Sequence, residues 1–191
     1  NKMAFVCPTR TGSTTLHTYL NGHGWFRLKE KHESLENLIK LYPNLVEYKV
    51  YGFFRDPLSR FESCLLYFKQ NLGFSSVFNE RIKSSGIGKT VQELSYEDIV
   101  DNFNKLFKLG GVLFKPQTFW LNDPRVTALD FHNRKLELEK VIGLISDEIP
   151  KLNASTDFGR SVITDKVRAF VRDYYAADYQ FAKDALGKEY A

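Results

Sequence analysis

Short apolar runs and longer amphipathic stretches alternate along the chain. Residues 3–7 form a continuous apolar run that stops at Pro8, a pattern typical of a strand buried on both faces. A polar loop over 9–13 follows, and over 14–20 the apolar residues recur at helical spacing. Strand, short polar loop and helix in this order predict a phosphate-binding geometry, in which N–H groups at the start of a helix face an anion.

The same alternation predicts the remaining elements. Two further apolar stretches, 48–54 and 126–131, are predicted strands. The predicted helices cover 34–41, 57–68, 95–107, 136–145 and 164–187, and the Gly- and Ser-rich residues 73–90 are predicted to form a mobile loop. Three helix starts carry a recognisable signal: Asp56 before Pro57, the capping box Ser95-Tyr96-Glu97-Asp98, and Thr164.

Strands that alternate with helices predict an α/β, P-loop-like three-layer fold with a central, mainly parallel sheet flanked by helices. No internal repeat, low-complexity tract or Pro/Gly linker divides the sequence, so residues 1–191 are predicted to form a single domain. Ligands of such sheets bind beyond the carboxyl ends of the strands. Because the loops at 10–15 and 55–63 each follow a predicted strand, we expect both to converge on one crevice.

Composition excludes several classes of protein. Hydrophobic residues make up 43% and aromatic residues 15% of the chain, which excludes a disordered or fibrous protein. The net charge of +4 does not argue for nucleic-acid binding and would equally suit a pocket for a polyanionic nucleotide. Cys7 and Cys64 lie in apolar surroundings and are expected to be buried thiols, and no metal-ligand spacing is present. No apolar run approaches the ~20 residues that span a bilayer.

The first cluster with chemical potential is Arg10-Thr11-Gly12-Ser13-Thr14-Thr15. Gly12 would let the backbone approach a phosphate closely, while the hydroxyl groups and one guanidinium supply donors. A Walker A loop would need Lys directly after its second Gly, whereas Ser13 follows Gly12 here and Cys7 occupies the place of the first Gly. This departure disfavours an ATPase or GTPase of the usual design. A hydroxyl-rich helix N-cap without a ligand is the alternative interpretation of the same residues.

The second cluster is Arg55-Asp56-Pro57-Leu58-Ser59-Arg60-Phe61-Glu62-Ser63. Arg55 ends a predicted strand, and Ser63 lies two turns into the next predicted helix. Each residue alone is also compatible with a solvent-facing position. Their combination is more informative than either one.

Together the two clusters resemble the sulfotransferases that use 3′-phosphoadenosine 5′-phosphosulfate (PAPS), especially a small soluble member of the carbohydrate and heparan-type branch. That family has a P-K-x-G-[ST]-[ST] loop after its first strand, and an Arg at a strand end followed by Ser eight residues later, commonly as R-[DN]-P-x-x-R-x-x-S. This sequence matches the second motif at Arg55, Asp56, Pro57, Arg60 and Ser63, and the first at Gly12, Ser13 and Thr14. It departs from the first motif at Arg10, which replaces the Lys, and at Pro8, which sits one residue early. Residues 114–121 and 152–155 resemble later segments of the family.

The resemblance implies a sulfotransferase domain that moves a sulfuryl group from PAPS to an acceptor hydroxyl by in-line displacement. It needs no metal and releases adenosine 3′,5′-bisphosphate. The implied 5′-phosphosulfate site comprises Arg10, Thr11, Gly12, Ser13, Thr14 and Thr15, and the implied 3′-phosphate site comprises Arg55 and Ser63. Arg10 and Ser13 are suited to the oxygens of the leaving phosphate.

The catalytic base of the resembled family is a His or Glu between the two phosphate motifs, an interval that contains Lys29-Glu30-Lys31-His32-Glu33. His32 is the first candidate because its ordinary pKa lies near neutrality. Glu33 and Glu30 are rivals, and a solvated mixed-charge run is the bland interpretation. His17, His23 and His132 are weaker candidates for the base. Gln117 and Trp120 are weaker candidates for contact with the acceptor or the adenine.

Two other functions stay open at this point: a non-catalytic module that binds 3′-phosphoadenosine nucleotides, and an atypical P-loop phosphotransferase that holds Mg²⁺ through Asp130. A nucleic-acid binder lacks a basic face interleaved with exposed aromatic residues. The acceptor is unidentified: the family branch implies a carbohydrate, while a lipid, a small metabolite and a tyrosine side chain remain alternatives. We expect a cytoplasmic enzyme of bacterial or viral type, or a Golgi-lumen enzyme if an anchor upstream of Asn1 was removed.

Overall fold

The computed structural model describes residues 2–72, 75–143 and 162–190. The chain falls into two compact units. Unit 1 comprises Asn1–Asp56, Pro116–Ala154 and Ala177–Ala191, and unit 2 comprises Pro57–Lys115 and Ser155–Ala176. The single domain over 1–191 stays a prediction. Among the described residues, no helix is long and apolar enough to cross a membrane.

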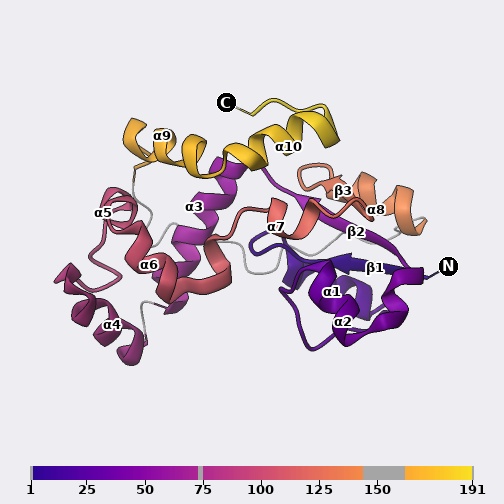
Figure 1. Cartoon of the computed structure of the whole chain (residues 1–191), viewed down its shortest axis with the longest axis horizontal. Helices are drawn as coiled ribbons and strands as arrows, with labels where there is room; N and C mark the ends of the chain where they lie inside the picture. Colours follow the sequence, from indigo (N-terminus) through magenta and orange to yellow (C-terminus); the bar gives the residue numbers. More distant parts are fainter. Residues whose placement is uncertain (1, 73–74, 144–161, 191) are drawn as a thin grey trace. The chain divides into compact units, whose positions relative to one another are not determined.

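Unit 1 is built on a parallel sheet of three strands. These are β1 (Met3–Val6), β2 (Lys49–Phe54) and β3 (Val126–Asp130), and they lie side by side in the order β1-β2-β3 (Figure 1). All three predicted strands are confirmed, with ends that differ from the prediction by one residue. The parallel sheet flanked by helices confirms the α/β class.

Helices cover both faces of this sheet. On one face, α1 (Ser13–Asn21) and α8 (Arg134–Ile142) pack against the side chains that the three strands present there. The buried residues of this core are Cys7, Leu16, Tyr19, Leu20, Phe53, Leu129 and Leu138. On the other face lie α7 (Thr118–Leu121) and α10 (Ala176–Leu186). A Cβ at Gly52 would lie 2.4 Å from Leu121, so the glycine lets α7 approach β2, while Phe181 of α10 stacks on Phe54 at 5.7 Å.

Two short helices connect α1 to β2. They are α2 (Leu35–Leu41) and the 3-10 helix η1 (Pro43–Glu47). Ser34 caps α2 by accepting a hydrogen bond from the N–H of Asn37. The predicted helix over 34–41 is therefore confirmed.

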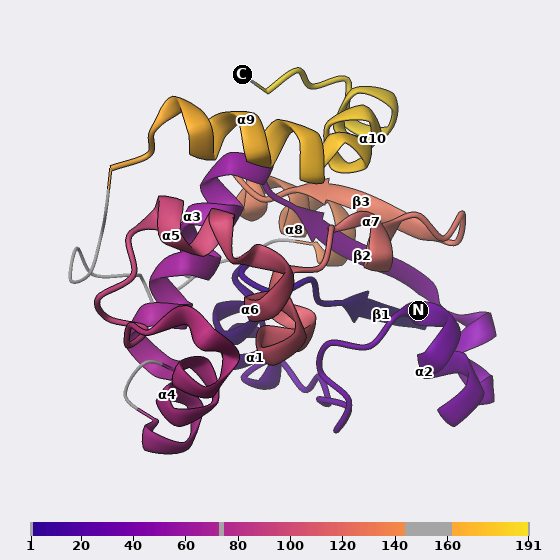
Figure 2. The same cartoon turned by 60° about the vertical axis from the view of Figure 1, so that its left-hand side comes forward.

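Unit 2 is helical and has an aromatic interior. Its main helix is α3 (Pro57–Tyr67), which begins at Pro57 as predicted and continues into a π-helical segment, η2 (Phe68–Leu72). The other elements are α4 (Ser76–Ile82), η3 (Lys83–Ile87), α5 (Tyr96–Asp101), α6 (Phe103–Gly110), η4 (Gly111–Phe114) and α9 (Asp165–Tyr174). Helix α9 packs across α3 and α5 (Figure 2). The rings that meet inside the unit are Phe61, Phe103, Phe114, Phe170, Tyr174 and Tyr175.

The predicted mobile loop over 73–90 is wrong in its centre, where α4 and η3 form. Ser75 accepts a hydrogen bond from the N–H of Phe78 and caps α4. Phe78 and Ile82, one helical turn apart, are both buried. The glycine and serine content of this stretch hid a short amphipathic helix. Residues 73–74 lie outside the described residues.

Two predicted helices are each divided by a one-residue kink. The helix predicted over 95–107 breaks at Asn102, where φ is −107°, and the helix predicted over 164–187 breaks at Tyr175, where φ is −104°. Asn102 favours the break because its side chain donates a hydrogen bond back to the Asp98 carbonyl. The buried hydroxyl of Tyr175 donates to the Phe114 carbonyl at 2.8 Å, which ties the second kink to the packing of unit 2.

The predicted helix boundaries otherwise agree with the structure. Ser95 forms the capping box with Asp98, and Thr164 caps α9. Helix α8 starts two residues earlier than predicted and ends before Gly143, whose φ of 95° stops it. The predicted continuation to residue 145 and the family-like stretch 152–155 lie outside the described residues.

Candidate functional site

The loop between β1 and α1 has two residues in the left-handed backbone region. Gly12 has φ 73° and is the N-cap of α1, without a capping side chain. Arg10, at φ 62°, is a non-glycine residue in this region, which stores conformational strain. The Thr11 hydroxyl donates to the Pro8 carbonyl at 2.8 Å and closes the turn. The N-terminus of α1 thus follows a tight loop, and its first N–H groups carry the positive end of the helix dipole.

The other residues of the first motif lie at the start of α1. Ser13 and Thr15 are buried, and Thr14 is half-buried. The N-cap position of α1 belongs to Gly12 and shows no side-chain hydrogen bond. A phosphate ligand at this helix start stays a prediction.

Two loops contact the ring of Phe131, the first residue after β3. A Cβ at Gly12 would lie 2.9 Å from the Cε2 atom of this ring, so any side chain there would displace the loop. The guanidinium of Arg55 lies 5.1 Å from the ring centroid and donates to the Arg10 carbonyl at 3.2 Å. The loop after β1 and the end of β2 therefore meet, as expected of neighbouring parallel strands.

The main chain of Arg55 is held by a side chain from far along the sequence. The Gln117 side-chain oxygen accepts from the Arg55 N–H at 2.9 Å, and its amide nitrogen donates to the Arg55 carbonyl at 2.7 Å. Gln117 is fully buried. It continues the hydrogen bonding of β2 beyond the strand end and positions the Arg55 backbone. Its suggested contact with acceptor or adenine stays a prediction.

Asp178 in turn fixes Gln117. This buried carboxylate accepts from the N–H groups of Gln117 and Thr118 at 2.8 and 2.9 Å, and from the Thr118 hydroxyl at 3.0 Å. It caps the start of α7, where N–H groups have no partner within the helix. A chain of buried polar contacts thus runs from α10 through α7 to the backbone of Arg55.

A cluster of cations surrounds the N-terminus of α1. Lys31 donates from its ammonium to the Thr14 hydroxyl at 3.4 Å. Burial lowers the pKa of Lys31, and the neighbouring charges of Arg27 and Arg10 lower it further. These cations repel one another without a ligand, so an anion bound among them would relieve the repulsion.

His32 is anchored at both its ring and its backbone. Its Nδ1 lies 2.7 Å from the Cys7 carbonyl, an oxygen that can only accept, so Nδ1 carries a proton, and in the neutral ring the lone pair is on Nε2. The His32 carbonyl accepts from the indole N–H of Trp120 at 3.0 Å. This tautomer is the one that a general base acting through Nε2 requires. Trp120 is nearly fully buried and supports His32.

The rival carboxylates have local partners. Glu33 accepts from the Asn37 amide at 2.9 Å, within the first turn of α2. Glu30 accepts from the Tyr42 hydroxyl at 2.7 Å. Of the three candidates, His32 is the one tied directly to the residue that precedes the phosphate-type loop.

His17 and Cys7 form a pair that is neutral. The Cys7 sulfur lies 3.7 Å from His17 Nε2. Burial raises the pKa of the Cys7 thiol to about 11, and burial, with help from Lys31 and Arg27, lowers the pKa of His17 to about 4. At neutral pH the pair is therefore a thiol and an uncharged imidazole. Cys7 and Cys64 are both free and buried, which confirms the prediction for the two cysteines.

The remaining motif residues lie in unit 2. Ser63 is buried on α3. Arg60 is fully buried, donates to the carbonyls of Leu113 and Lys115, and lies 5.9 Å from the Tyr175 ring centroid. Arg60 is thus a structural residue that fastens η4 to α3. The shared site of Arg55 and Ser63 stays a prediction.

Asp130, the residue that a metal-dependent phosphotransferase would use, is engaged by protein groups. Its carboxylate pairs with Lys188 and accepts from the His132 N–H and the Asn133 amide. The exposed His132 lies beside it. Within residues 2–72, 75–143 and 162–190, no three His, Cys, Asp or Glu side chains gather in a group that could hold a metal ion.

Two residues of this region escaped the sequence analysis, and a third was named there for another role. Lys31 stood in a mixed-charge run that suggested solvent exposure, Phe131 ended an apolar strand, and Gln117 carried no signal for its bonds to the Arg55 backbone. Only Lys31 could have been found, because Arg10 departs from the expected lysine and a nearby lysine could replace its charge.

Comparison with known proteins adds no assignment. No protein-family model matches the chain, and no curated protein matches it.

Proposed function

We propose that this protein is a PAPS-dependent sulfotransferase with a P-loop-like arrangement of its phosphate loop. The observation that carries the proposal is the contact of Arg55 with the Arg10 loop over Phe131. Two sequence motifs that each resemble a phosphate site of one nucleotide lie 45 residues apart, and their arginine and loop are in contact. A bisphosphorylated nucleotide requires such a pair of anion sites.

The 5′-phosphosulfate is assigned to the N-terminus of α1. Backbone N–H groups after Gly12 and the cations Arg10 and Lys31 supply the charge that the departing phosphate needs. Lys31 provides the ammonium that the family's loop carries at the position of Arg10. The left-handed backbone at Arg10 and Gly12 preorganises this loop before any ligand binds.

The 3′-phosphate is assigned to Arg55, and a part for Ser63 stays a prediction of the sequence motif alone. The clamp of Gln117 on the Arg55 backbone supports this role, because a planar guanidinium must be oriented to bind phosphate through two hydrogen bonds.

His32 Nε2 is assigned as the base that takes the proton of the acceptor hydroxyl. The acceptor oxygen forms a bond to sulfur while the bond from sulfur to the 5′-phosphate oxygen breaks, and its electron pair leaves with the phosphate. The hydroxyl proton moves to Nε2. The Nδ1–H bond to the Cys7 carbonyl then stabilises the imidazolium, since a charged donor binds a carbonyl more strongly.

The first experiment is calorimetric titration with adenosine 3′,5′-bisphosphate, compared with 5′-AMP and with ATP, in the absence of metal. A strong preference for the bisphosphate is expected. Preference for ATP, or no binding of any of the three, would remove the basis of the proposal. Bisphosphate binding without transfer to any acceptor would favour the non-catalytic module.

The second experiment compares two arginines that lie on the same aromatic ring. Arg55→Ala should weaken binding of the bisphosphate by about 100-fold, as expected for loss of a charge-assisted pair of hydrogen bonds. It should weaken binding of 5′-AMP little. Arg134→Ala is the matched control, because Arg134 lies 5.3 Å from the centroid of Phe131 without belonging to the motif. Equal losses for both nucleotides in Arg55→Ala would contradict the 3′-phosphate assignment.

A further inference from the structure

A pocket of about 490 Å³ lies within unit 1, outside the phosphate loop. The pocket is lined by the whole of β1, by one side of α1 and by the segment from His23 to Lys31. Leu38, Leu45 and Tyr48, which lie between this segment and β2 in the sequence, also line it. A volume of this size accommodates a small organic molecule. The proposed nucleotide site does not use this pocket.

The larger part of the pocket lining is apolar. Its lining includes Phe5, Leu16, Leu20, Trp25, Leu38 and Leu45. Phe5 and Trp25 approach each other at 5.6 Å between ring centroids, so one wall is aromatic. Such walls offer no partner for a hydroxyl group buried against them, and each unpaired hydroxyl would cost free energy.

The polar lining includes Cys7, His17 and Lys31, which interact with one another. The thiol and the imidazole are uncharged at neutral pH, as described above, so Lys31 and the neighbouring Arg27 supply the charge at this end. Asn21, Glu30 and Tyr48 also belong to the lining, so a ligand that fits this pocket combines a mainly apolar body with polar groups, one of them beside Lys31.

This polar end adjoins the proposed transfer site through two residues. The carbonyl of Cys7 accepts from His32, and the ammonium of Lys31 donates to Thr14 at the start of α1. Both residues also line the pocket. His32 itself does not line the pocket, so Cys7 and Lys31 are the residues through which the polar end of a bound ligand would adjoin the proposed base and the proposed leaving group.

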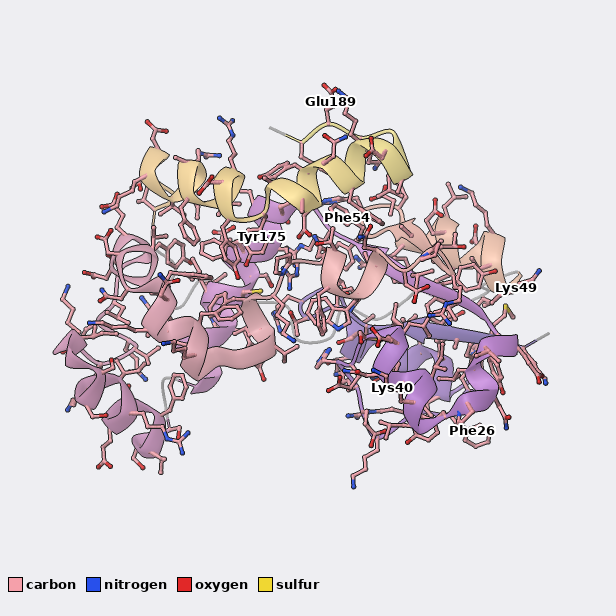
Figure 3. The ribbon with its side chains drawn as sticks, viewed as in Figure 1. Phe26, Lys40, Lys49, Phe54, Tyr175 and Glu189 are labelled. Atoms are coloured by element: carbon pink, nitrogen blue, oxygen red, sulfur yellow. The ribbon has the colours of Figure 1, made fainter. Side chains whose placement is uncertain are left out.

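Phe26 lines the outer, solvent-exposed part of the pocket. This side chain is 96% exposed, although it belongs to the lining, and its ring stands at the outer edge of the molecule (Figure 3). A phenylalanine so exposed gains free energy when a ligand covers it.

We infer that this pocket binds the sulfate acceptor, and that the acceptor is a hydrophobic alcohol or phenol instead of a carbohydrate. The inference rests on the proposed function. The apolar walls between β1 and α1 hold the hydrocarbon part, and the hydroxyl faces the Cys7–Lys31 end. The oxygen of this hydroxyl forms the new bond to sulfur, and its proton moves to His32 as in the step above.

The test measures binding of 2-naphthol and of N-acetylglucosamine by calorimetry to the protein saturated with adenosine 3′,5′-bisphosphate. Phe26→Ala should weaken 2-naphthol about fivefold, a fraction of the gain from fully burying a phenylalanine. Leu41→Ala is the matched control, because Leu41 is 57% exposed and does not line the pocket. Thermal melting verifies that both variants fold. Incubation with PAPS and mass spectrometry then measures sulfated product.

Binding and sulfation of 2-naphthol, with loss in Phe26→Ala only and no binding of the sugar, would support the inference. If the bisphosphate binds but 2-naphthol does not, or if Phe26→Ala has no effect, the inference is overturned and the proposed function stands. If 2-naphthol binds but the bisphosphate does not, the proposed function fails and the pocket is no acceptor site.

Discussion

Unit 1 and unit 2 place their arginines and aromatic rings in different combinations. In unit 1 the ring of Phe131 lies against a glycine of a loop and against the half-buried Arg55. In unit 2 the ring of Tyr175 lies beside Arg60 within an aromatic interior, and both side chains are fully buried. The same pair of residue types therefore lies at a strand end in one unit and inside a helical core in the other.

The two arginines are five residues apart in the same motif, yet their side chains have different roles. Arg55 receives its backbone order from Gln117, and its guanidinium donates to the Arg10 carbonyl. Arg60 uses its guanidinium to satisfy two main-chain carbonyls. Replacement of the half-buried Arg55 should therefore cost less stability than replacement of the fully buried Arg60.

The largest expected effect is that of Arg60→Ala on stability. Its hydrogen bonds to the carbonyls of Leu113 and Lys115 are to a charged group, each worth about 1.5–3 kcal/mol. Their loss should lower the free energy of unfolding by roughly 3–6 kcal/mol, measured by urea denaturation. Arg55→Ala removes a bond of this kind, to the Arg10 carbonyl, from a half-buried guanidinium and should cost less, about 1–2 kcal/mol. Similar losses in the two variants would remove the distinction between the arginines.

Gln117→Leu should have the next largest effect, because it leaves the N–H and carbonyl of Arg55 without this partner. We expect a loss of roughly 2–5 kcal/mol in the free energy of unfolding, with weaker binding of adenosine 3′,5′-bisphosphate. Thr118→Val removes one hydrogen bond to Asp178 and should cost about 1 kcal/mol. If Gln117→Leu left bisphosphate affinity unchanged, the clamp would not position Arg55 for a ligand.

The sequence predicts most of this architecture from local signals, although it missed α4 and its Ser75 cap. Pro8 and Pro57 mark the end of β1 and the start of α3, and hydroxyl caps mark α5 and α9. The kink at Tyr175 carries no such signal, since a one-residue break leaves the apolar periodicity intact. At Asn102 the signal is a single side chain that bonds back to the Asp98 carbonyl.

The candidate site is less accessible to sequence reasoning than the strands are. Gln117 and Arg55 are 62 residues apart, and nothing local connects an amide to a distant backbone. Lys31 approaches Thr14 only because the segment after α1 returns toward its N-terminus. The motifs predicted which loops meet, whereas the residues that support those loops depend on long-range packing.

Lys31→Met tests the proposed 5′-phosphosulfate site, as Arg55→Ala tests the proposed 3′-phosphate site. Because Lys31 contacts Thr14 at the start of α1, its loss should weaken the binding of 5′-AMP and of the bisphosphate alike, by about tenfold each. Arg55→Ala should affect the bisphosphate alone. Lys29→Met is the matched control, as Lys29 is exposed in the same charged run. Calorimetry that found equal weakening in both lysine variants would indicate general electrostatic attraction and not a site.

The smallest expected effect concerns His17, which is half-buried in unit 1. Burial, with smaller contributions from Lys31, Arg27 and His32, lowers its pKa to about 4, below the value near 6.5 of an unfolded chain. Between these values the unfolded state binds more protons, so stability is fully present above pH 6.5 and decreases as pH falls toward 4.

Urea denaturation at pH 7 and pH 5 measures this decrease. His17→Gln should lose less stability than the wild type over that interval, because glutamine does not titrate. The control is His23→Gln, which removes an exposed histidine that stacks on Tyr19 at 4.6 Å. An unchanged pH dependence in His17→Gln would mean that His17 takes up a proton in the folded protein near neutrality. The polar end of the pocket would then carry an additional positive charge, and an anionic ligand would fit it better than an alcohol.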